Sequence, residues 1–175
     1  MAVRVFLLLL AAGLATASVS GARESDSTRS RTVPCDEIID LPRFPHWGNA
    51  QPQYRNRLVL DAISVPPAFL QQISPSGQPS WRYFSKWGMV VRSDGRPVTV
   101  TVPARWRDRV AISWGNGGHG VFQTIRFAGC RFGKNVGNAY AGGFFLRSRS
   151  ACVPLTFRVG DRTATVRFGI GRRCP

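Results

Sequence analysis

The sequence predicts an all-β protein, a single two-sheet β-sandwich of about eight strands that is immunoglobulin-like or jelly-roll-like. Apolar and polar residues alternate in most segments after residue 56, which is the period of a half-buried strand. β-Branched and aromatic residues fill these segments, and Gly, Pro, Asn, Asp and Ser separate them. Eight short strands imply a sandwich or a barrel. The only helix expected is a turn or two at Ala68 to Ile73, after two prolines.

Residues 1–22 have the pattern of a cleavable signal peptide. Arg4 precedes an apolar run, Val5 to Leu14, that is too short to span a bilayer as a helix. Small residues follow at the spacing that signal peptidase requires, so we expect cleavage after Ala17 or Ala22. A retained N-terminal anchor is the alternative. The pattern predicts a secreted, extracytoplasmic protein.

Residues 23–34 form a polar lead in which Val33 is the only apolar residue besides Pro34. Such a segment buries too little surface to offset the cost of ordering, so we expect it to be disordered. Residues 35–175 are expected to form one basic β-sandwich domain, which is long enough for a single core. No later segment is apolar for long enough to cross a membrane, so we do not expect an integral membrane protein.

The strands of this domain are expected between turn residues. Before them, a proline-rich stretch from residue 34 to residue 54 is expected to lie extended over the core. Alternation places Val98, Val100 and Val102 inward, with Thr99 and Thr101 outward. The expected strands are residues 57–65, 81–92, 98–102, 110–114, 121–127, 144–147, 153–159 and 163–170.

The last two strands carry the most specific local prediction. A two-residue turn at Gly160 and Asp161 places the apolar residues of both strands on one face and threonine and arginine on the other. The predicted cross-strand pairs are Phe157 with Ala164, Leu155 with Val166 and Val153 with Phe168. The residues expected to face solvent are Thr156, Arg158, Thr163, Thr165 and Arg167.

Four cysteines follow the signal, and an even number in an exported chain favours two disulfides. Three pairings are possible. We expect Cys130 to pair with Cys152 and Cys35 with Cys174, because the second bond would tie both ends of the domain together. The chain-entropy model gives about 4 to 5 kcal/mol for so long a loop. Because a metal site would need closely spaced ligands, we expect neither a metal nor another cofactor.

The chain is strongly basic, with 24 Lys and Arg against nine Asp and Glu and a net charge of +15. From Arg126 to the end, Asp161 is the single acid. Such a surface attracts phosphates and carboxylates, and salt weakens the attraction. The preference for Arg over Lys also fits the codon use of a GC-rich genome, although the planar guanidinium grips both kinds of anion bidentately. The candidate binding residues are Arg147, Arg149, Arg158 and Arg167.

Support for catalysis is sparse. His119, in a glycine-rich segment after Trp114, is the single catalytic candidate, but a general base needs a nucleophile and an orienting group, and no acid lies near it in sequence. The segment Gly115 to Gly120 matches the pattern G-x-G-x-x-G. A strand rather than a helix is expected after it, so we do not expect a dinucleotide site.

Three segments carry a resemblance to other sequences. They are Trp81 to Arg92, Val100 to Asn116 and Asn138 to Cys174, the last reading NAYAGGFFLRSRSACVPLTFRVGDRTATVRFGIGRRC. Over roughly the last hundred residues the chain resembles uncharacterised exported proteins of high-GC Gram-positive bacteria. Their pattern has Trp immediately before Asn138, where this chain has Gly137. The resemblance implies export and a compact fold, and it transfers no activity and no functional residue.

Two functions of different classes fit these patterns. The first is a non-enzymatic binding or surface protein whose arginine-rich face contacts anionic polymers of the cell envelope, such as teichoic acid or an acidic glycan. No specific nucleic acid partner is expected. The alternative is a secreted hydrolase of a glycan or cell-wall substrate, which would use His119 and an acid brought near it by the fold.

Overall fold

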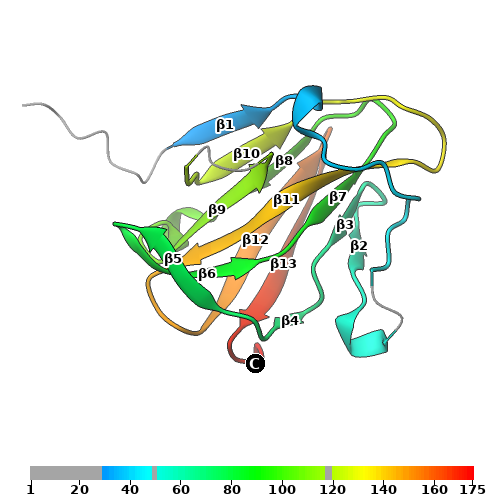
Figure 1. Ribbon diagram of the computed structural model, residues 1–175. Coiled ribbons are helices and arrows are strands. Elements are labelled where there is room, and N and C mark those ends of the chain that lie inside the picture. The colour runs from blue at the N-terminus through cyan, green and yellow to red at the C-terminus, as the bar shows by residue number, and fades with distance from the viewer. Residues whose placement is uncertain (1–28, 49–50, 117–119) are drawn as a thin grey trace, which may run out of the picture.

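A computed structural model describes residues 29–48, 51–116 and 120–175 (Figure 1). These residues form thirteen strands, β1 to β13, and three short 3-10 helices. The strands make two packed sheets, so the predicted all-β sandwich is confirmed. The expected signal peptide, the first part of the polar lead and His119 lie outside the described residues.

The first sheet, sheet I, has the strand order β1-β10-β8-β12-β13-β4. Its outermost pairs, β1 with β10 and β4 with β13, are parallel, and its inner pairs are antiparallel. The bounds of its strands are β1 Ser30–Val33, β4 Phe69–Leu70, β8 Val98–Thr101, β10 Thr124–Phe127, β12 Ala151–Val159 and β13 Arg162–Ile170.

The second sheet, sheet II, has the order β2-β3-β7-β11-β6-β5, with β9 paired to β11. Its longest strand, β11, pairs first with β7 and then, in its second half, lies between β6 and β9. In Figure 1, β11 crosses in front of β12 and β13 of sheet I. The bounds are β2 Arg57–Val59, β3 Ile63–Val65, β5 Ser74–Gln78, β6 Trp81–Lys86, β7 Met89–Arg92, β9 Val110–Gly115 and β11 Gly137–Leu146.

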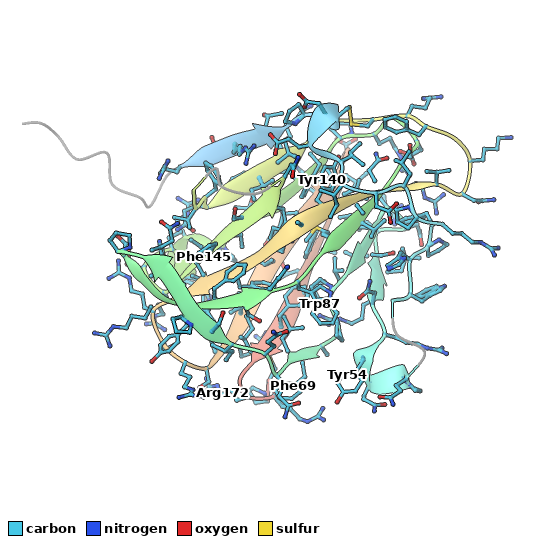
Figure 2. All side chains as sticks on the ribbon, in the orientation of Figure 1. Tyr54, Phe69, Trp87, Tyr140, Phe145 and Arg172 are labelled. Atoms are coloured by element: carbon cyan, nitrogen blue, oxygen red, sulfur yellow. A yellow bond between two sulfur atoms is a disulfide. The ribbon has the colours of Figure 1, made fainter. Side chains whose placement is uncertain are left out.

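The inner faces of the two sheets pack into one main core. The ring of Phe144 in sheet II lies 5.3 Å from that of Phe168 in sheet I and 5.5 Å from that of Trp114. Aromatic pairs of this kind contribute about 0.5 to 1.5 kcal/mol beyond their buried area. Phe145, on the other side of β11, belongs to a smaller cluster with Trp81. Figure 2 shows Phe145 and Tyr140 towards opposite ends of β11.

Two segments expected as single strands are each divided. Residues 57–65 form the hairpin β2–β3, because Leu60 and Asp61 turn the chain with φ values of 53° and 54°. Residues 81–92 form β6 and β7, which are separated by Trp87 and Gly88. The expected helix at Ala68 to Ile73 is wrong: its centre forms β4, because the end of β13 supplies a pairing partner from a distant part of the sequence.

The predicted hairpin of the last two strands is confirmed as β12–β13. All three predicted cross-strand pairs occur in its register. Gly160 has a φ of 56° with open space around it, which is the left-handed conformation that the turn requires. Arg158 and Arg167 are exposed on the solvent side as expected.

The end of the expected disordered lead is instead part of the sandwich. Ser30–Val33 form β1, which pairs in parallel with β10, and the side chain of Val33 is fully buried. The prediction of disorder is wrong for these residues, and the fold begins before residue 35. Pairing with β10 supplies the backbone hydrogen bonds, and that partner lies too far along the chain to be read from local composition.

The predicted disulfide pairing is also wrong. The bonds join Cys35 to Cys130 and Cys152 to Cys174. β1 places Cys35 next to the end of β10, just before Cys130. Cys152 lies opposite Gly169 in the ladder, and the last residues fold back over that glycine, where a methyl group would lie 2.4 Å from the carbonyl oxygen of Arg172. This fold-back brings Cys174 to Cys152.

Two disulfides indicate an oxidising environment outside the cytoplasm. None of the helices in the described ranges is long and apolar enough to cross a membrane.

Candidate anion-binding face

Strand alternation builds the outer face of sheet I. In β8, Val98 and Val100 are buried in the core, so Thr99 and Thr101 point outward. The same alternation in β10 and β12 leaves arginine and threonine on the outside. Partners in register lie on the same face, so the outward residues form rows that cross neighbouring strands.

Two such rows follow from the register. The hydroxyl row has one Ser or Thr from each of five neighbouring strands: Ser30, Thr124, Thr101, Thr156 and Thr165. The arginine row lies two residues further along and alternates Thr with Arg: Thr32, Arg126, Thr99, Arg158 and Thr163. Because neighbouring strands are about 4.8 Å apart, the backbones of Arg126 and Arg158 are about 10 Å apart.

A third group of cations flanks the hydroxyl row on its other side. Arg167 lies opposite Pro154 in the ladder, and Arg105 and Arg172 join it around a hollow of about 180 Å³. We call Arg105, Arg167 and Arg172 the arginine hollow. Arg158 pairs with Thr163 of β13. Arg167 lies four residues further along the same strand, which is a distance of about 13 Å. The hydroxyl row is therefore bordered by guanidinium groups on both sides.

Acidic groups are missing from the strands of this sheet, because no described strand of sheet I contains Asp or Glu. Asp61 and Asp94 lie in turns and are engaged by Arg162 and Arg96. No ion pair within the described ranges engages the exposed side chains of Arg126 or Arg158. The outer face therefore carries more positive than negative charge, and its attraction for anions falls as salt rises.

The hydroxyl groups of the hydroxyl row can make further hydrogen bonds besides those they already make to each other. Thr156 and Thr165 share one hydrogen bond of 3.1 Å, and Thr124 donates to Thr101 over 3.4 Å. Each hydroxyl has one donor and two acceptor positions, so capacity remains towards solvent. The outer face of sheet I thus offers cationic donors for anionic groups next to hydroxyls for the alcohol groups of the same ligand.

The four arginines predicted from the sequence do not form one site. Arg158 and Arg167 lie on the outer face of sheet I, but Arg147 and Arg149 lie in the loop that precedes β12. This loop, orange in Figure 1, is at the opposite end of β12 from Arg158. The nine residues of β12 separate the two ends by about 25 Å. Arg147 instead lies 5.5 Å from the ring of Trp81.

Arg126, Arg105 and Arg172 were not identified from the sequence as candidate binding residues. The alignment of the threonines into rows was not predicted either. The β12–β13 register was sufficient to place Thr156, Arg158 and Thr165 on one face. The pairing of β12 with β8 and of β8 with β10 joins distant segments. A local pattern does not specify such pairings, so the rows could not be assembled from the sequence.

Of the two histidines in the sequence, the described ranges contain His46. His119 lies outside them, and the backbone N–H of His46 donates to Ser64 Oγ over 3.0 Å. His46 lines a separate pocket of about 270 Å³ with Asp40 and Asn56. In residues 29–48, 51–116 and 120–175, no group of three His, Cys, Asp or Glu side chains is placed to hold a metal ion.

No protein-family model and no curated protein sequence matches this chain.

Proposed function

We propose that this chain is an exported, non-enzymatic binding protein whose outer face of sheet I contacts anionic polymers of the cell envelope that also carry hydroxyl groups. The observation that supports the proposal is the hydroxyl row between the arginine row and the arginine hollow, in a sheet whose described strands contain no Asp or Glu. An extended polymer can engage several of these side chains at once. Each exposed ion pair contributes only about 0 to 1 kcal/mol, but linked contacts on one polymer reinforce each other.

Replacing Arg126 and Arg158 together by glutamine is expected to lower the salt concentration at which the protein elutes from immobilised polygalacturonate. The variant loses both cations of the arginine row, and salt competes with the contacts that remain. The matched control is Arg147→Gln with Arg149→Gln, which removes the same charge from the loop before β12. We expect its shift to be less than half as large.

The hydroxyl row provides a second arm of this test. Replacing Thr101 and Thr156 by valine keeps the charge, the side-chain shape and the strand preference. We expect weaker retention on polygalacturonate and unchanged retention on polyphosphate, which has no alcohol groups along its chain. Equal shifts for the two arginine pairs would show that net charge alone governs retention, and the proposal would then be wrong.

A further inference from the structure

A second basic site lies at the end of β7, where the loop between β10 and β11 folds against it. The site is a pocket of about 450 Å³ that is lined by three cations, Arg92, Arg131 and Lys134. Its volume is within the range of small-molecule binding sites. Because Val91 faces the core, Arg92 points to the outer side of sheet II and belongs to a different surface from the arginine row.

The side chain of Arg92 is held in place and keeps one donor unused. Its guanidinium carbon lies 4.9 Å from the ring centre of Phe44, a buried residue whose N–H donates to the carbonyl of Asn135. The Nε atom of Arg92 is buried and has no hydrogen-bond partner in the described ranges. A buried donor without a partner lowers the stability of the folded chain.

The loop that carries Arg131 and Lys134 is fastened to the sandwich. Ser93 Oγ accepts a hydrogen bond from the N–H of Phe132 and donates one to the carbonyl of Cys130. Cys130 is also bonded to Cys35. Because these contacts hold the loop backbone before any ligand arrives, binding has to order the side chains of Arg131 and Lys134 but not the backbone that carries them.

The carboxylate at the pocket, Asp94, offsets the three cations only in part, because Arg96 already engages it. The Nε and Nη2 atoms of Arg96 lie 2.9 and 2.6 Å from Asp94 Oδ2, and its N–H donates to Oδ1 over 3.0 Å. Partial burial raises the pKa of Asp94, but the hydrogen bonds and charge of Arg96, with the charge of Arg92, hold that pKa below its ordinary value. Asp94 is therefore ionised and paired.

We propose that this pocket binds a phosphate monoester carried on a small organic molecule. Three converging cations exceed what one carboxylate can neutralise, whereas a phosphate monoester carries about −1.5 to −2 charges at pH 7. Its oxygens can accept from the guanidinium groups of Arg92 and Arg131 together. The proposal is independent of the outer face of sheet I, since it rests on other residues.

The test uses the full chain and inorganic phosphate as the probe, at constant ionic strength. Phosphate is expected to bind saturably in the millimolar range and to shift the NMR signal of the Arg92 Nε–H group. Acetate carries a single charge, and its affinity is expected to be lower than that of phosphate by about tenfold or more. Replacing the exposed Arg131 and Lys134 by glutamine should weaken phosphate binding by about tenfold or more. The pair Arg147→Gln and Arg149→Gln should leave it unchanged.

Three results would each overturn the proposal: no saturable binding of phosphate, equal binding of acetate and phosphate, or unchanged affinity in the Arg131 and Lys134 variant. The melting temperature of each variant checks that it folds. The variant lacking Arg126 and Arg158 separates this pocket from the polymer-binding face, because it should bind phosphate as the parent chain does.

Discussion

Replacing Cys35 and Cys130 by serine is expected to lower the free energy of unfolding by about 4.7 kcal/mol, the value the chain-entropy model gives for their sequence separation of 95 residues. The bond between Cys152 and Cys174 spans 22 residues, and its loss should cost about 3.5 kcal/mol. Urea unfolding of the two double variants measures both values. In a domain stabilised by about 5 to 15 kcal/mol, the first loss is a large share of the total.

The bond between Cys35 and Cys130 also joins segments that contribute to the two proposed sites. Cys35 follows β1, which contributes Ser30 and Thr32 to the outer face of sheet I, and Cys130 precedes the pocket residue Arg131. A larger loss from removing the bond between Cys152 and Cys174 would contradict the predicted order. A non-reducing peptide map that joined Cys130 to Cys152 would contradict the pairing itself.

Replacing Gly142 by alanine is expected to cost about 4 kcal/mol or to prevent folding. Gly142 has a φ of 156°, and a methyl group there would lie 1.9 Å from the carbonyl oxygen of Ser113 and 2.6 Å from the ring of Trp114. Overpacking costs about 1 to 3 kcal/mol, and a positive φ adds about 1 to 2 kcal/mol for a residue with a Cβ. The midpoint of urea unfolding measures the change.

The matched control for this variant is Gly160→Ala. Gly160 also has a positive φ, of 56°, but among the described residues other than its chain neighbours no atom lies within 4 Å of where its methyl group would be. We therefore expect a loss of about 1 to 2 kcal/mol from the backbone conformation alone. Equal losses for the two variants would show that the close approach of β9 to β11 at Gly142 contributes nothing.

The parts of the fold that could be predicted are those that local sequence determines. The β12–β13 register follows from a glycine turn and two alternating strands, and the inward set Val98, Val100 and Val102 follows from alternation alone. β1 and the disulfide pairing could not be predicted in this way. Both depend on β1 lying beside β10, which is a contact between residues that are about a hundred positions apart.

For the candidate site too, local sequence predicted which residues are exposed but not which of them lie together. Charge and alternation identified Arg158 and Arg167 as exposed cations, but they also selected Arg147 and Arg149, which lie in the loop at the opposite end of β12 from Arg158. The count of arginines does not distinguish these positions. The distinction comes from sheet order, because the pairing of β12 with β8 and of β8 with β10 sets Arg126 in the same row as Arg158.

The most direct test of the central proposal is to map the contact surface by NMR while short oligogalacturonates are added to the full chain. The account predicts that the largest shifts occur at the backbone amides of Thr99, Thr101 and Thr156 and at the Nε–H groups of Arg126 and Arg158, and that salt reverses them. Shifts confined to the loop that carries Arg147 and Arg149, or spread evenly over all exposed arginines, would contradict binding at the outer face of sheet I.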